Sequence, residues 1–220
     1  STVTGLRRSG AGLGPSLAFF VTAPALNIVV LILAFDLLPL KLAFARLSLG
    51  LIAAVGVTYV VAKLTPEKEE LASHGLPAAL GIEPLREIIK NWMKNTWYIS
   101  RIVIPILVLG IIIIGIFKTI LPFEIIAKYF GNNLLSTVLA SAVGTVLMVP
   151  TFTEVLWVAE FTQKGMGIGP AVALLITLPA VSFPSLLVLG KVLKSYRVAV
   201  YLGIFILALG VISGMVFSLL

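Results

Sequence analysis

Most residues that could do chemistry in this apolar chain lie in one stretch, residues 150–185. Glu154 is an acid inside the apolar run 129–161, where a charge is costly unless it serves a transport pathway or a coupling site. Hydroxyl and amide side chains beside it, and in a related stretch near the start of the chain, could hydrogen-bond a solute or an ion. The predicted substrate- or ion-binding residues are therefore Thr2, Thr4, Asn27, Thr151, Thr153, Glu154 and Ser182.

Some of these residues also have a structural explanation. Thr151 and Glu154 have the T-x-x-E spacing of a capping box, which closes two free N–H groups at a helix start. A cap and a substrate or ion role both remain open for them. The hydroxyl of Thr153 could bond a substrate or the preceding turn of backbone, and we favour the substrate.

Glycines and prolines at fixed spacing interrupt the apolar sequence twice. A shift of 155 residues lays the Gly-x-Gly-x-Gly-Pro run at 10–15 on the run at 165–170, and nine of 26 positions are identical over residues 10–35. Such interruptions free backbone groups that lipid cannot satisfy, so broken helices belong beside protein or a water-filled cavity. Asn27 and Ser182 could bond carbonyls that the preceding prolines leave without a donor. We expect breaks or hinges at Gly10, Gly12, Gly14, Pro15, Pro24, Pro150, Gly165, Gly167, Gly169, Pro170 and Pro179.

The composition indicates an all-α, polytopic helical membrane protein. The chain is 60% hydrophobic and 11% charged, and its charge-free runs fit about six spans of roughly 20 residues, with short broken helices between them. We expect one span at 99–121 and a further helix at 134–149, which leads to the break at Pro150. It has no cysteine and one histidine, His74, which we expect in a solvated loop. Without a nucleophile and base, a metal-ligand cluster or a nucleotide-binding motif, we expect no enzyme, cofactor or metal site. The net charge of +7 indicates no nucleic-acid partner, because the basic residues flank apolar runs.

We divide the chain into three parts. Residues 1–64 form a first repeat, 65–98 a cytoplasmic polar linker with an amphipathic helix, and 99–220 a second repeat. The first repeat begins in mid-motif compared with the second, so we expect it to lack an N-terminal portion. Arg46, about one turn into a span at 41–63, is expected to snorkel to the interface. Glu160 lies on a different helical face from Glu154, so we do not expect them to pair.

The basic residues favour two repeats of opposite orientation. If each copy makes five helical passes, the second copy is inverted and 11 of the 16 basic residues lie on one side. Parallel repeats would divide them nine to seven. The positive-inside rule therefore favours inversion and puts the linker in the cytoplasm. Many secondary transporters use inverted repeats and bind substrate where their broken helices meet.

Three motifs carry a resemblance to a known family. They are Pro150-Thr151-Phe152-Thr153, the run from Lys164 to Pro170, and Thr177-Leu178-Pro179-Ala180, with residues 10–27 as a second copy. In these motifs the chain resembles the ArsP-type predicted permeases, duplicated membrane proteins that include organoarsenical exporters. The resemblance implies a permease. It does not imply an arsenical substrate, because members often have a cysteine beside the polar break, where this chain has Phe152.

Together these features predict a multi-pass permease of the cytoplasmic membrane. It would move a small solute by alternating access at the junction of its repeats, as an exporter. A channel and a non-transporting subunit of a larger complex remain alternatives, because 220 residues are few to enclose a pathway. A homo-oligomer or the expected N-terminal segment would then complete it. The lipid bilayer is the one partner that the sequence identifies, and the solute is not specified.

Overall fold

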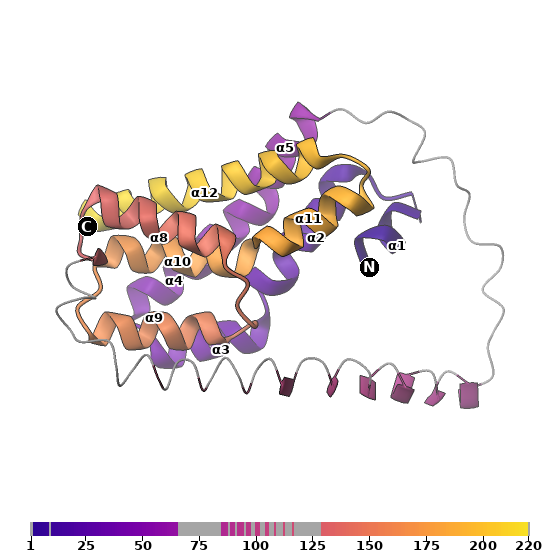
Figure 1. Ribbon diagram of the computed structural model, residues 1–220, viewed down its shortest axis with the longest axis horizontal. Coiled ribbons are helices and arrows are strands. Elements are labelled where there is room, and N and C mark those ends of the chain that lie inside the picture. The colour runs from indigo at the N-terminus through magenta and orange to yellow at the C-terminus, as the bar shows by residue number, and fades with distance from the viewer. Residues whose placement is uncertain are drawn as a thin grey trace.

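The structure is a computed structural model that describes residues 2–8, 10–65 and 129–219, with scattered positions between 85 and 116 (Figure 1). The regular elements within 2–65 and 129–219 are all helices, as the sequence predicts. The linker 65–98, His74 and the predicted span at 99–121 lie largely or wholly outside the described residues. The helices are α1 (Thr2–Arg8), α2 (Leu13–Ala25), α3 (Ile28–Leu37), α4 (Leu40–Ile52), the π-helix η1 (Ala53–Val57), α5 (Thr58–Leu64), α8 (Leu134–Val146), α9 (Thr153–Gln163), α10 (Ile168–Ala180), α11 (Phe183–Val192) and α12 (Tyr196–Leu219).

Three helical stretches are long and apolar enough to cross a membrane: Leu40–Leu64, Ile168–Val192 and Tyr196–Leu219. A fourth span arises if α2 and α3, which are bent by 41° at their junction, count as one. The prediction of about six spans therefore exceeds the three or four found within the described ranges. The predicted helix at 134–149 falls short because α8 has 13 residues and ends at Val146, before the extended segment that leads into Pro150.

The internal duplication extends to the helix boundaries. A shift of 155 residues lays α2 on α10 and α3 on α11, with the same first and last positions in each pair. Before each pair, the chain turns through a glycine in the left-handed region, with φ of +88° at Gly10 and +87° at Gly165. Glycine adopts this conformation at no steric cost. Gly12 and Gly167 are the N-caps of α2 and α10, and Pro15 and Pro170 follow within the first turn.

The helix breaks fall just after the predicted prolines. Pro24 lies inside α2, and the break comes at residues 26–27; Pro179 lies inside α10, and its break comes at residues 181–182. Asn27 and Ser182 then start the next helices. Asn27 Oδ1 accepts a hydrogen bond from the backbone N–H of Val29 at 2.9 Å, and Ser182 forms a capping box with Ser185. Their side chains therefore cap N–H groups, and the predicted bonds to proline-freed carbonyls are wrong.

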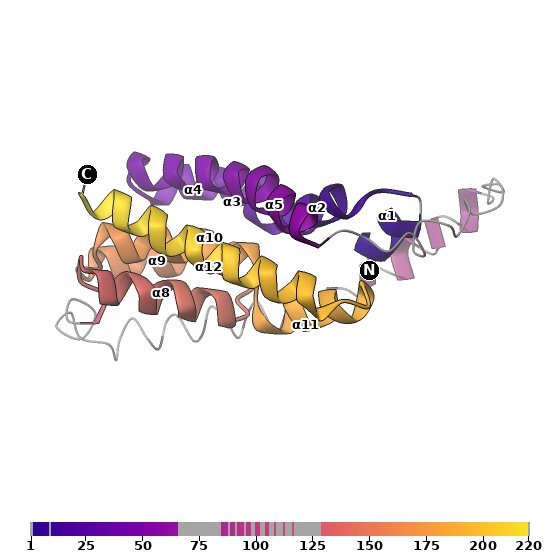
Figure 2. The same cartoon turned by 90° about the horizontal axis from the view of Figure 1, so that it is seen from above.

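Helix α10 lies at the centre of the described structure. Residues 169–178 are all buried. Viewed from above, α2 to α5 lie along one side of α10 and α12, whereas α8 lies along the other (Figure 2). The helix that contains the second break is thus surrounded by protein, as broken helices in a membrane require.

Small residues allow α8, α10 and α12 to approach closely. A Cβ atom at Gly214 of α12 would lie 2.6 Å from the carbonyl oxygen of Gly169 on α10, and one at Gly210 would lie 2.5 Å from Ser141 Oγ on α8. Ser141 Oγ also donates to the carbonyl oxygen of Leu207 at 2.8 Å. Close backbone approach and interhelical hydrogen bonds hold helices together in lipid. Gly169, a predicted hinge, lies inside α10 and serves this contact.

Candidate functional site

Arg46 and Glu154 form a buried ion pair between α4 and α9. The Nη2 atom of Arg46 donates to Oε1 of Glu154 at 2.9 Å, across 108 positions of sequence. Each residue is 1% exposed. The prediction that Arg46 snorkels is therefore wrong. Arg46 lies six residues beyond the start of α4, about 9 Å along the helix, where it faces the Glu154 carboxylate on α9.

Arg46 also satisfies a backbone group that a proline leaves without its usual partner. In a regular helix the carbonyl oxygen of Leu175 would accept from the N–H of residue 179, which is a proline and has none. Arg46 Nη1 donates to this oxygen at 3.3 Å. One guanidinium thus connects the proline-containing turn of α10 to the start of α9.

The capping box predicted for Thr151 and Glu154 does not form. Helix α9 begins at Thr153, and its N-cap is Phe152, whose side chain cannot cap and whose φ is +80°. A left-handed residue other than glycine costs about 1–2 kcal/mol, and such strain concentrates at functional sites. Thr153 Oγ1 donates to the carbonyl oxygen of Pro150 at 2.6 Å.

A cavity of about 280 Å³ lies where the helix breaks meet. The end of α2, the segment before α9, and the junction of α10 with α11 all contribute to its wall. The wall is mostly apolar with a few polar groups, which is typical of small-molecule sites. Glu154 is the only charged residue in the described part of its lining, and Arg46 does not line it. The residues that line it include Phe20, Pro24, Thr151, Glu154, Pro179 and Ser182.

The structure brings some of the predicted binding residues to this cavity and not others. Thr153 is fully buried and Asn27 caps α3, and neither lines the cavity. Thr2 and Thr4 lie in α1, but their side chains are outside the described residues, so their role stays a prediction. Those that line it are Thr151, Glu154 and Ser182.

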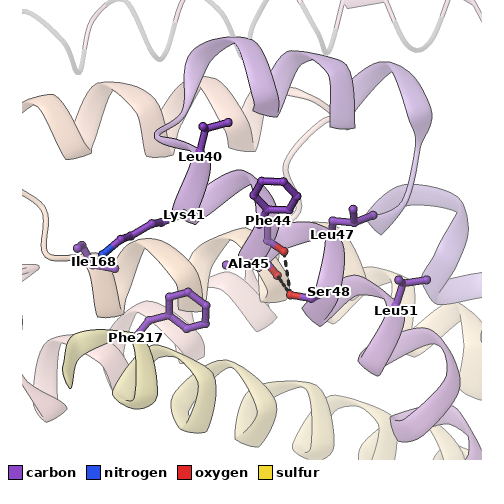
Figure 3. Close-up of a pocket in the computed structure, with 9 residues that line it drawn as sticks. All are labelled: Leu40, Lys41, Phe44, Ala45, Leu47, Ser48, Leu51, Ile168 and Phe217. Atoms are coloured by element: carbon purple, nitrogen blue, oxygen red, sulfur yellow. Dashed lines mark hydrogen bonds between the residues drawn. The ribbon is translucent and has the colours of Figure 1, made fainter. Parts of the chain in front are cut away.

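A larger cavity, of about 690 Å³, lies along α4 and has a different character (Figure 3). Its wall is almost wholly apolar. Lys41 extends along it toward Ile168, and the hydroxyl of Ser48 donates to its own helix, at the carbonyls of Phe44 and Ala45. No polar groups converge on it, so the smaller cavity is the candidate site.

Sequence reasoning missed the role of Arg46. The available signal was a charged residue within an apolar span, which by default faces protein or water and pairs with a partner. The repeat gave no help, because a shift of 155 places Tyr201 at the position of Arg46. Among the residues that the structure describes, no three His, Cys, Asp or Glu side chains come together in a way that could hold a metal ion.

Comparison with known proteins assigns the family. The family ArsP_1, described as predicted permease, matches residues 1–219. The chain belongs to this family. Membership supports a membrane permease.

Two curated relatives of the chain have names that state no function. UPF0718 protein MJ0584 of Methanocaldococcus jannaschii is 38% identical over 134 residues, which are 59% of this chain and 37% of that protein. UPF0718 protein YraQ of Escherichia coli K12 is 31% identical over 190 residues, which are 85% of this chain and 53% of that protein. The matched part thus spans about half or less of each relative's length. No solved structure matches the chain.

Proposed function

We propose that this chain forms the transport core of a multi-pass permease in the cytoplasmic membrane, which carries a small solute by alternating access. The observation that carries the proposal is the cavity of about 280 Å³ at the junction of the broken helices, with a charged side chain in its wall. A simple anchor gains nothing from two helix breaks, which leave backbone groups to be satisfied. Secondary transporters place their substrate sites at such junctions.

Helix directions support repeats of opposite orientation. In Figure 1 the chain runs from right to left through α2 and α3, and from left to right through α10 and α11. The distribution of basic residues along the sequence favours the same arrangement. In inverted repeats the two halves can exchange conformations, so that the site opens first to one side of the membrane and then to the other.

The Arg46–Glu154 pair is suited to hold one of these two states. It joins α4, from the first copy, to α9, from the second, and it lies next to the cavity. Rocking of one copy against the other would break or remake the pair. Transport out of the cell is proposed from the resemblance to ArsP-type permeases, which include exporters.

Cysteine labelling tests the proposal, because the sequence has no cysteine of its own. Thr151→Cys puts a thiol at the exposed edge of the cavity, and Ser195→Cys puts one in the basic turn after α11. In vesicles, a membrane-impermeant thiol reagent should label Thr151→Cys from either side and Ser195→Cys from the cytoplasmic side alone.

The outcomes separate the proposal from its alternatives. Labelling of Thr151→Cys from one side alone would contradict alternating access, and labelling from neither side would favour a non-transporting subunit. A channel would also label from both sides. It would, however, give continuous conductance across a planar bilayer, which a carrier does not.

A further inference from the structure

The two members of the buried ion pair are placed differently with respect to the cavity. Glu154 lines it, whereas Arg46 is absent from the lining and reaches Glu154 from α4. A ligand that enters the cavity therefore meets the carboxylate and not the guanidinium.

The rest of the cavity wall offers little to an anion. Among the residues that the structure describes, no Lys, Arg or His lines it. The helix starts around it would attract an anion, but Asn27 caps α3 and Ser182 caps α11, and the first turn of α9 carries the negative charge of Glu154. The polar groups left to a ligand are carboxylate and hydroxyl oxygens, the ligands that cations prefer.

The ion pair itself is incompletely bonded. A stable buried pair requires good geometry and hydrogen bonds to all remaining donors. Arg46 instead makes one bond to Glu154 and one to Leu175, and its Nε atom is buried without a hydrogen-bond partner. Arg46 and Glu154 therefore do not form the bidentate pair, with two parallel N–H···O bonds, that makes arginine–carboxylate pairs strong.

We propose that Glu154 is a binding site for a small monovalent cation, and that Arg46 is the resident counter-ion that this cation displaces. The proposal rests on the cavity being the transport site, as proposed above. When a cation binds the carboxylate, the bond from Arg46 Nη2 to Glu154 Oε1 breaks and the charge of Arg46 loses its partner.

Within the described ranges, Arg46 has no other acid on the elements that surround Glu154. Neither α2 nor α10 contains a charged residue, α3 carries only Asp36 near its far end, and Glu160 lies further along α9. The carbonyl of Leu175 would remain as a neutral acceptor. A buried unpaired charge is unfavourable, so α4 must move relative to α9 until Arg46 reaches water or another partner. Cation binding is thereby coupled to movement between the copies.

Trp157 provides a reporter of this event. It lies three residues after Glu154 on α9, and the other two tryptophans, Trp92 and Trp97, can be replaced by phenylalanine. The purified chain in lipid nanodiscs would be titrated with methylammonium chloride, with acid, and with sodium phosphate as the anion. Choline chloride, whose cation is bulkier, controls for ionic strength.

We expect a saturable change in Trp157 fluorescence with methylammonium or acid, absent with choline and phosphate. Glu154→Gln should abolish it. Arg46→Gln should lower the half-saturating concentration about tenfold or more, because the competing cation is gone, whereas Arg46→Lys should stay near wild type. If Arg46→Gln is too unstable to titrate directly, its melting temperature should rise more steeply with methylammonium than that of the wild type.

Three results would overturn the proposal: a response that survives Glu154→Gln, a phosphate response that Arg46→Gln abolishes, or no cation response at all. A response to acid but not to methylammonium identifies the cation as the proton. The measurement does not depend on transport. If the cation binds but Thr151→Cys is not labelled from both sides, the proposed function is wrong and the cation site stands. If Thr151→Cys is labelled from both sides but no cation binds, only the cation site is wrong.

Discussion

Arg46 donates to the carbonyl oxygen of Leu175, which is the group in α10 that loses its helical donor because residue 179 is a proline. The same guanidinium lies 2.9 Å from Glu154. Arg46 therefore connects the proline-containing turn of α10 in the second copy, the start of α9 and a span of the first copy. We therefore expect a substitution at any one of these three places to affect the structure at the other two.

Removing one member of the ion pair should destabilise the protein far more than removing both. Arg46→Ala or Glu154→Ala leaves a buried charge without its partner, and we expect each to cost about 3–5 kcal/mol. The double variant Arg46→Met/Glu154→Leu should stay close to wild type. Denaturant unfolding in detergent measures the free energy of unfolding of each variant. A double variant whose loss equals the sum of the two single losses would contradict the ion pair.

The two left-handed glycines should be equally sensitive to a side chain. Gly10→Ala and Gly165→Ala each force alanine to a positive φ, and we expect a loss of about 1 kcal/mol in both. Apart from its chain neighbours, no atom of the described residues lies within 4 Å of a Cβ at Gly10, so they do not crowd a side chain there. Gly5→Ala, in α1 and equally uncrowded, is the control and should be neutral or stabilising. Unfolding free energies that differ widely between the first two variants would argue against equivalent turns.

The contact between α10 and α12 should not tolerate a methyl group at Gly214. A Cβ there would meet the backbone oxygen of Gly169, which cannot move aside alone, and we expect Gly214→Ala to cost about 1–3 kcal/mol. Gly56→Ala is a matched control, since its nearest neighbour, Ile52 Cγ2, is at 3.8 Å. Thermal melts of the two variants should differ clearly; equal melting temperatures would show that the helices separate easily.

The hydroxyls of the Thr-x-Thr pair should differ in their contribution to stability. Thr153→Val removes the bond to the Pro150 carbonyl and should cost about 1 kcal/mol. Thr151→Ala removes an exposed group that caps no helix, so a loss within about 0.5 kcal/mol is expected. A larger loss for Thr151→Ala would restore the capping box as the role of Thr151.

The helix boundaries of the two copies could be predicted because their signals are local. A glycine turn, a glycine N-cap and a proline in the first turn act within a few residues, and both copies carry them at the same spacing. The span count was less predictable. Hydropathy does not show where the extended segment before Pro150 ends α8, and the predicted span at 99–121 lies largely outside the described residues.

The Arg46–Glu154 pair could not be predicted from one sequence, because its partners are 108 positions apart and no local pattern links them. The snorkelling rule gives the wrong outcome for Arg46, since it considers distance to the interface and ignores acids on neighbouring helices. The capping box failed for a different reason. It assumes that Thr151 precedes the first helical turn, whereas Phe152 adopts a left-handed conformation that large side chains rarely take.

Alternating access requires that the cavity beside Glu154 opens first to one side of the membrane and then to the other. The most direct measurement is the rate at which a membrane-impermeant thiol reagent labels Ser182→Cys from each side, with and without Arg46→Gln. Breaking the ion pair should raise the rate from one side and lower it from the other, with the ratio changing about tenfold or more. Rates that rise together, or that do not change, would contradict alternating access at this cavity.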